Sequence, residues 1–570
     1  MAGFADDSGA FELYIEAAAN DLFGAGKQQY HLSISSLCMM DEERYQFSLD
    51  LDLLLDLANS LPEKSVRRAR IIYGLNEICN VYAPDPGAAK AIAQKLLRNP
   101  ACPSTLKAYS VGHAHLDLAW LWPMRESRRK GGRTFANALR LLDLYPDYIF
   151  GASQAQLYSW IKQDYPALYE EVKAAVKSGR WEVQGASWVE FDTNLPSAES
   201  LIRQFVYGRD FFDSEFGIVP NCLWLPDCFG FSGNLPQIMK GCKVDYFVTQ
   251  KLSWNESNTF DQHLFIWQGI DGSEVRAHQL PTNDYNFSNN PSAFRQTEAR
   301  FAQAEIAESY LNLFGIGDGG GGPTRNHIEY GLRQRDLEGS SRFIFSKAED
   351  FFAEYALIPA HILPRCYTEL YLEFHRGTYT TQAVMKQDNF FSERLLHAAE
   401  WMAALANLHS GKHEYPQQLH LIWKDTLLLQ FHDILPGSSI TKVYEDAHAV
   451  SSANHARLRA FIQEQAAAEP TPESYTIFNP SPTPVDQWLS FPIRYRESAA
   501  VLNHCEISQV LHDDDAMQIL VHMEPYSKAR LDFMAELSPM LQEREEILPC
   551  SGVYHLKSNT LNVKVSNTGS

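Results

Sequence analysis

Three side chains that can bind a metal alternate between Val111 and Trp122, namely His113, His115 and Asp117. They follow an apolar run, which predicts that the segment leaves a β-strand. In an extended segment, residues two apart point to the same side, so imidazole and carboxylate groups can converge on one cation. Hydrogen-bonded capping of a strand end is the alternative. Two histidines and an aspartate within five residues favour a metal site.

Further acidic and imidazole groups follow other apolar segments. Glu190 and Asp192 lie at the end of one predicted strand, and Asp227 lies at the end of the next. His432 and Asp433 end a strongly apolar helical segment, where unpaired polar groups would cost roughly several kcal/mol if buried. A single carboxylate after a strand is usually a turn residue or a helix cap. The prediction of one metal site therefore depends on their joint occurrence.

The glycine-rich segment Gly315–Pro323 carries one acid, Asp318. Its glycine spacing matches the dinucleotide-binding pattern, but Asp318 would face a pyrophosphate with like charge. No Lys-Ser/Thr pair follows, as a phosphate-binding Walker loop would require. Glycines that let the backbone approach a ligand, together with one projecting acid, favour a sugar site. A nucleotide-binding enzyme remains the minor alternative.

Six aromatic residues lie near these motifs in the sequence, and flat aromatic rings are common platforms for sugars. We expect two of the six to contact a sugar and the others to pack in the core. The six are Trp120, Trp122, Trp188, Phe229, Tyr285 and Tyr379.

The elements that must position these groups differ along the chain. Residues 108–366 alternate short apolar runs with helical segments, which is typical of an α/β domain with a mostly parallel sheet. In such sheets the ligand lies beyond the carboxyl ends of the strands, where the polar motifs occur. Residues 1–107 are predicted to be mainly helical. Residues 367–470 are predicted to form a three-helix bundle that contributes a metal ligand, and residues 471–570 a partial β domain.

The composition narrows the class of protein. Of 570 residues, 45% are hydrophobic and 21% charged, the balance of a folded globular chain of several domains. The net charge of −21 argues against nucleic acid and anionic membranes as partners. No apolar stretch reaches the roughly 18 residues that span a bilayer. The nine cysteines include no Cys-x-x-Cys pair, and Met1–Leu22 lacks the features of a secretory signal. We expect a cytoplasmic protein, and a homo-oligomer remains open.

Taken together, the motifs resemble glycoside hydrolase family 38, the retaining α-mannosidases, and within it the cytosolic and bacterial branch. They occur in the family's order over residues 108–440. The segments that carry the resemblance are Gly112–Trp120, Gln184–Asp192, Trp224–Ser232, Gly317–Pro323, His375–Thr380 and Gln430–Asp433. The resemblance implies a zinc-dependent hydrolase that removes terminal, non-reducing α-D-mannose from oligosaccharides.

The resemblance also implies roles for particular residues. The zinc ligands would be His115, Asp117, Asp192 and His432. Asp192 would in addition be the nucleophile that forms a covalent mannosyl–enzyme ester. Trp120 would stack on the sugar, Asp227 would hydrogen-bond to its hydroxyls, and Tyr379 would lie close by. Two histidines and two aspartates would also accept Co²⁺ or Mn²⁺.

Asp318 is the candidate for the general acid/base. Better-known members of the family carry an Asp-Asp pair where this chain has Gly317-Asp318-Gly319, and Asp318 is the only carboxylate in that loop. In a retaining enzyme its carboxyl group would lie about 5–5.5 Å from that of Asp192.

The chain departs from the family in length. Members of this branch carry a longer N-terminal region and large C-terminal β domains, so we expect the C-terminal β domain of this chain to be incomplete. Two alternatives stay open. One is a metal-dependent carbohydrate deacetylase, which also uses histidine and aspartate at strand ends. The other is a truncated, non-catalytic mannose-binding remnant.

Overall fold

The computed structural model describes residues 39–411, 413–466, 474–492, 499–503, 506–512, 516–534, 553–557 and 562–566. The chain forms two compact units. One comprises the chain to Leu396 together with Glu414–Arg459, and the other His397–His413 together with the chain from Ala460 onward. The part of the predicted N-terminal helical region in residues 1–38, and the predicted boundary at residues 470–471, lie outside the described residues.

From residue 39 onward, where the described part of the chain begins, three helices precede the first strand. They are α1 (Glu42–Ser60), α2 (Val66–Val81) and α3 (Pro86–Leu97). The side chains of Asp41, Ser65 and Asp85 cap their first turns by accepting backbone N–H groups. Apolar residues of all three helices form a common core with Leu337, which belongs to the α/β region between α10 and β9.

One of the two sheets of the α/β region is parallel and has five strands. Its order is β3-β2-β1-β8, and β9 also pairs with β1. The strands are β1 (Lys107–His113), β2 (Phe150–Ala152), β3 (Trp181–Val183), β8 (Ser309–Phe314) and β9 (Arg342–Phe345). Because β1 and β8 are parallel neighbours, the loops that follow them leave the same edge of the sheet.

A second five-stranded sheet has the order β10-β6-β7-β5-β4. All neighbouring pairs are parallel except β6 and β7, which form an antiparallel pair. The strands are β4 (Cys222–Trp224), β5 (Tyr246–Thr249), β6 (Leu264–Gln268), β7 (Glu274–Gln279) and β10 (Arg365–Tyr367).

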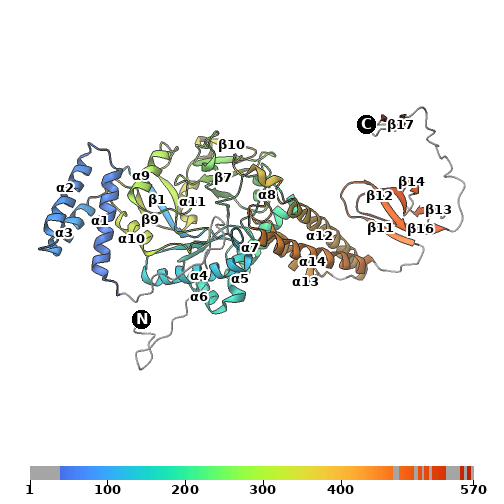
Figure 1. Ribbon diagram of the computed structural model, residues 1–570, viewed down its shortest axis with the longest axis horizontal. Helices are drawn as coiled ribbons and strands as arrows, with labels where there is room; N and C mark the ends of the chain where they lie inside the picture. Colours follow the sequence, from blue (N-terminus) through green and yellow to red (C-terminus); the bar gives the residue numbers. More distant parts are fainter. Residues whose placement is uncertain are drawn as a thin grey trace, which may run out of the picture. The chain divides into compact units, whose positions relative to one another are not determined.

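Helices connect and flank these strands (Figure 1). They are α4 (Met124–Leu144), α5 (Ala155–Asp164), α6 (Pro166–Lys177), α7 (Ala198–Phe216), α8 (Leu235–Gly241), α9 (Pro291–Arg300), α10 (Arg325–Arg333) and α11 (Ala348–Ala356), with short 3₁₀ turns η2 (Lys251–Trp254), η3 (Ala360–Ile362) and η4 (Arg376–Tyr379). Aromatic rings pack α4 against the first sheet. Phe135 on α4 meets Trp181 on β3 edge-on, with ring centroids 4.9 Å apart, and Trp181 pairs with Phe150 on β2.

Helices and then antiparallel strands complete the described chain. The helices are α12 (Ala383–Ser410), α13 (Gln417–Leu429) and α14 (Thr441–Ala466). The strands are β11 (Ser474–Asn479), β12 (Val485–Pro492), β13 (Ala499–Asn503), β14 (Glu506–His512), β15 (Ala516–Met523), β16 (Ser527–Met534), β17 (Val553–Lys557) and β18 (Asn562–Ser566). The predicted fold class is confirmed, with parallel sheets, a helical middle region and small antiparallel sheets. Among the described residues, no helix has the length and hydropathy to cross a membrane.

Close packing of α7 against the segment after β3 makes Gly208 sensitive to substitution. A Cβ at Gly208 would lie 2.2 Å from the carbonyl carbon of Ser187. We expect Gly208→Ala to displace α7 and to lower the free energy of unfolding by about 1–3 kcal/mol, measured by thermal denaturation. Gly241→Ala at the end of α8 is the matched control, because a Cβ there meets nothing within 4 Å. Equal unfolding midpoints for the two variants would contradict this packing.

Candidate active site

Two neighbouring loops at the edge of the first sheet bring two of the predicted acids, Asp117 and Asp318, together. Asp117 follows β1 and Asp318 follows β8. The backbone N–H of Asp117 donates to the carbonyl oxygen of Asp318 at 2.8 Å, and Leu116 forms an isolated parallel bridge with Asp318. The parallel pairing of β1 with β8 therefore continues into the loops that carry the functional groups.

His432 reaches this edge from the helical middle region. It follows α13, and Phe431 forms an antiparallel bridge with Phe191 in the segment after β3. The backbone N–H of Asp192 donates to Gln430 O at 2.9 Å. These backbone contacts join two segments about 240 residues apart in sequence and place His432 beside the strand ends.

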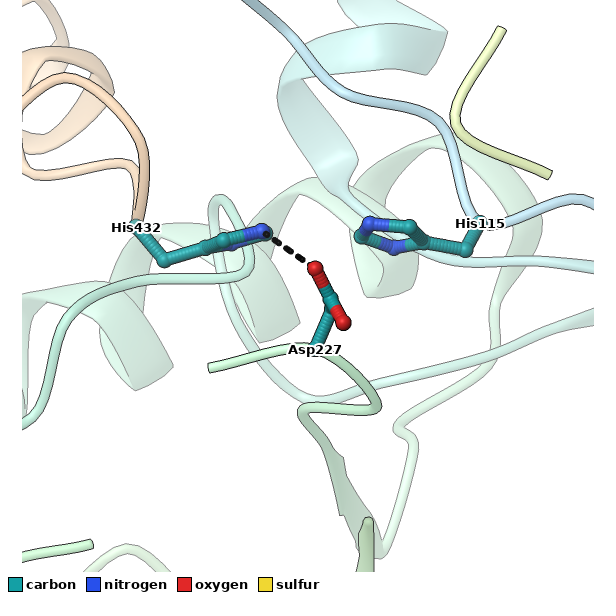
Figure 2. A group of neighbouring side chains, drawn as sticks. All are labelled: His115, Asp227 and His432. Atoms are coloured by element: carbon teal, nitrogen blue, oxygen red, sulfur yellow. Dashed lines mark ion pairs between the residues drawn. The ribbon is translucent and has the colours of Figure 1, made fainter. Parts of the chain in front are cut away.

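The imidazoles of His115 and His432 face a shared group of carboxylates. His115 Nε2 lies 3.0 Å from Asp117 Oδ1, and His432 Nε2 lies 3.6 Å from the same oxygen. His432 Nε2 also lies 3.9 Å from Asp227 Oδ2. Figure 2 shows the Asp227 carboxylate pointing between the two rings, which come from different segments of the chain. The ring centroids are 5.4 Å apart.

The donor set and its burial fit a divalent metal ion. His115 Nε2, Asp117 Oδ1 and His432 Nε2 are buried and close to one another, but none of them meets the geometry of a hydrogen bond. Burial without such a bond is costly unless a cation binds these atoms. Imidazole nitrogens with carboxylate oxygens suit zinc and related metals. Three overlapping groups of described residues have ligand atoms within 4.8 Å of one another: His115, Asp227 and His432; His115, Asp117 and Asp318; and Asp117, His432 and Asp433.

The buried carboxylates of Asp117 and Glu190 favour positive charge on the neighbouring imidazoles. Burial lowers the pKa of His115, but Glu190 and Asp117 outweigh that effect and leave the pKa well above its ordinary value. Burial raises the pKa of Asp117, but His115 and His432 outweigh it and lower the pKa to about 2. A metal ion can supply the same positive charge that protonated imidazoles supply in its absence.

Asp192 is held firmly next to these groups. Its Oδ1 accepts the backbone N–H groups of Asn194 at 2.9 Å and Leu195 at 2.7 Å. Burial raises the pKa of this carboxyl group, and the two amides oppose the rise, as do His432 and Lys386. Asp192 belongs to none of the three close ligand groups found among the described residues. Three of the four predicted metal ligands thus meet, since His115 and His432 both lie within 4 Å of Asp117 Oδ1. Asp192, the fourth, is near enough for the charge of His432 to lower its pKa.

Asp318 occupies a constrained position in the glycine-rich loop. Its φ of 56° lies in the left-handed region, which is uncommon for a residue with a side chain. The hydroxyl of Tyr285 donates to Asp318 Oδ1 at 2.8 Å. Burial, followed by the charge of Asp117, raises the pKa of Asp318 above its ordinary value. A raised carboxyl pKa is what a general acid requires near neutral pH.

Of the three predicted sugar-contacting residues, Asp227 belongs to the cluster and Tyr379 lies near Asp192. Asp227 forms a buried ion pair with Lys251, whose Nζ lies 2.6 Å from Asp227 Oδ1. Trp120 is half-buried, and its carbonyl oxygen accepts the N–H of Ile440. Tyr379 is half-buried in η4. Burial raises the pKa of its hydroxyl, and the negative charge of Asp192 raises it further.

His113 has a different role from its neighbours in the motif. Its Nδ1 lies 3.1 Å from the carbonyl oxygen of Gly151, and the indole Nε1 of Trp224 lies 3.4 Å from its Nε2. Burial lowers the pKa of His113 to about 4. Hydrogen-bonded capping of a strand end, which was the alternative for this motif, therefore accounts for His113 at the end of β1.

Two lysines near the site were missed by the sequence analysis. Lys251 follows β5 at its carboxyl end, so the position of strand ends offered a signal for it. Lys386 Nζ donates to the carbonyl oxygens of Thr381, Leu435 and Pro436 at 2.6, 2.9 and 2.9 Å. Lys386 thus connects the loop after His432 to the segment after η4, and no local motif indicates this contact.

Comparison with protein families gives two matches. Residues 105–357 match the glycosyl hydrolases family 38 N-terminal domain, and residues 373–468 match the alpha mannosidase middle domain. The two matches cover the strands, loops and helices that carry the residues described above.

Similar proteins include "Alpha-mannosidase 2C1" of Homo sapiens, which is 37% identical over 84% of this chain and 48% of its own length. "Alpha-mannosidase" of Saccharomyces cerevisiae is 36% identical over 76% of this chain and 43% of its own length. The chain spans about half the length of the curated relatives it matches. The crystal structure of an alpha-mannosidase from Enterococcus faecalis has the same fold, with a TM-score of 0.64 at 19% identity over 82% of this chain and 61% of that one.

Proposed function

The chain belongs to glycoside hydrolase family 38, and on that premise we propose that it is a metal-dependent, retaining α-mannosidase. Its substrates are oligosaccharides with terminal, non-reducing α-D-mannose. The observation that carries the proposal is the set of overlapping ligand groups formed by the buried residues His115, Asp117 and His432 with the half-buried Asp227, at the ends of parallel strands. The resemblance to the cytosolic branch of the family supports a cytoplasmic location as part of the proposal.

In this proposal, Asp192 and Asp318 carry out the covalent chemistry. The Asp192 carboxylate attacks the anomeric carbon while Asp318 gives its proton to the departing glycosidic oxygen. Asp318 then takes a proton from water, and the oxygen of that water displaces Asp192 with net retention. The backbone N–H groups of Asn194 and Leu195 both bind Asp192 Oδ1. In this proposal the other carboxylate oxygen, Oδ2, attacks the anomeric carbon.

The proposed metal is zinc, held by His115, Asp117 and His432 with Asp192 as the fourth ligand. Bound there, zinc would act as a Lewis acid on hydroxyls of the terminal mannose. Asp227 lies within the same group and is proposed to accept hydrogen bonds from sugar hydroxyls, with Lys251 balancing its charge. Trp120 and Tyr379 complete the proposed sugar site.

Metal removal tests this proposal. We expect the purified chain to hydrolyse 4-nitrophenyl α-D-mannoside, to lose at least about 90% of this activity after chelation, and to recover it with added zinc. The β-anomer is the control and should not be hydrolysed. Proton NMR of the product formed first should show the α-anomer. A folded, zinc-loaded chain without turnover would contradict the proposal, and release of acetate from acetylated sugars instead would favour the deacetylase alternative.

The hydroxyl of Tyr285 is expected to tune the proposed acid. Its hydrogen bond to Asp318 favours the carboxylate and so lowers the pKa of that group, against the rise caused by burial. Tyr285→Phe removes this hydrogen bond, so the pKa of Asp318 should rise. Because the general acid must be protonated, the alkaline limb of the kcat/KM profile should move to higher pH. An alkaline limb that stays in place or moves to lower pH would contradict this role.

A further inference from the structure

Glu190 is a fully buried carboxylate next to the proposed metal ligands. Its Oε2 lies 2.6 Å from His115 Nδ1, and its Oε1 accepts the hydroxyl of Ser153 at 2.6 Å. Its backbone N–H donates to the side-chain oxygen of Gln154 at 3.2 Å. Ser153 and Gln154 therefore hold both the side chain and the backbone of Glu190 in place, and its second carboxylate oxygen forms a close ion pair with the imidazole.

The backbone of the same residue contacts the second imidazole. The carbonyl oxygen of Glu190 lies 2.8 Å from His432 Nδ1, and it also accepts the backbone N–H of His432 at 3.2 Å. Glu190 thus faces the Nδ1 atom of both histidines, through its carboxylate for His115 and through its carbonyl group for His432.

This arrangement determines which nitrogen each ring presents to the cluster. An acceptor oxygen within 2.6–2.8 Å of Nδ1 favours a proton on that nitrogen, because two lone pairs at this distance would repel each other. The lone pair of a neutral imidazole then resides on Nε2. The Nε2 atoms of His115 and His432 are the ones that approach Asp117 Oδ1. Partners of this kind orient metal-binding imidazoles and make them more basic.

We propose that Glu190 is the positioning residue of the metal centre: it fixes the tautomer and ring orientation of His115 through its carboxylate and of His432 through its carbonyl oxygen. This inference rests on the metal site of the proposed function and extends it by a residue outside the proposed ligand set. Because a side-chain substitution leaves the carbonyl group in place, it acts on His115 and spares His432.

The test compares two variants by their affinity for metal. Glu190→Met keeps a similar length but removes the acceptor, and we expect zinc to bind about 10–100-fold more weakly, measured by competition with a chromophoric chelator. Glu190→Gln keeps an oxygen acceptor but loses the charge, and we expect a loss of about 3–10-fold. The visible absorption of bound Co²⁺ reports the ligand field directly and should change in the Met variant.

Glu182→Gln serves as the matched control. Glu182 lies on β3 in the same part of the chain, but its carboxylate accepts the side-chain amide of Gln184 and the backbone N–H of Ala348. We expect this variant to bind zinc within about twofold of the wild-type chain, because its carboxylate does not face the histidines.

The outcomes separate this inference from the proposed function. Absence of metal binding by the wild-type chain would contradict the proposed function itself. Zinc binding by the wild-type chain together with affinity within twofold for Glu190→Met would overturn only the role of Glu190. If circular dichroism shows that the Met variant does not fold, the Gln variant decides, and an unchanged affinity and Co²⁺ spectrum there overturns the inference.

Discussion

Asp192→Asn is expected to lower kcat for 4-nitrophenyl α-D-mannoside by about 10⁴-fold or more, because a carboxamide cannot form the proposed ester. This substitution should remove the nucleophile without disturbing the local structure. An Asn oxygen can accept the same two backbone N–H groups, from Asn194 and Leu195, that now bind Asp192 Oδ1. The variant should therefore fold, and thermal denaturation should give an unfolding midpoint near that of the wild-type chain.

Added azide distinguishes a lost nucleophile from a general loss of structure. In Asp192→Asn, azide can attack from the face that the carboxylate vacates, and the expected product is the β-mannosyl azide. The metal content of the variant must be measured, because Asp192 is also a proposed ligand. Asp425→Asn is the control, since Asp425 is a half-buried acid bonded to Asn454 on α14 and should leave kcat within about twofold. Activity above a tenth of the wild-type value would exclude Asp192 as the nucleophile.

Asp318→Asn is expected to have the second-largest effect, and its size should depend on the leaving group. A sugar leaving group needs a proton, so kcat/KM for an α-linked mannobiose should fall by about 10²–10⁴-fold. The 4-nitrophenolate group leaves without a proton, so kcat/KM for the aryl mannoside should fall far less. Its kcat should still fall, because hydrolysis of the ester then lacks a general base.

Measurements with both substrates and with azide test this role. Azide needs no general base, so it should raise kcat of Asp318→Asn for the aryl mannoside and give the α-mannosyl azide. This product is the opposite anomer to that expected from Asp192→Asn. An equal fall in kcat/KM for both substrates, with no response to azide, would show that Asp318 is not the acid/base.

The sequence by itself determined the motifs and the class of fold. Alternation of His115 and Asp117 depends only on the period of an extended chain, so their convergence could be predicted locally. The positions of the polar groups could also be predicted locally, because they directly follow the apolar runs that form β1, β3, β4 and β8. The strands β2, β6, β7, β9 and β10 are not followed by such motifs, and strands this short lack a distinctive period, so the sequence alone does not indicate them.

Only the tertiary structure decided how distant groups meet. His432 reaches His115 and Asp227 because the segments around Phe191 and Phe431 pair through the backbone. The contact of Glu190 with both histidines likewise joins three segments of the chain. Spacing alone could not separate His113 from His115, since both alternate in the same motif. The family resemblance selected His115, and the contacts of His113 with Gly151 and Trp224 give the physical reason. Local periodicity sets the direction of a side chain, whereas its partners depend on contacts between residues far apart in sequence.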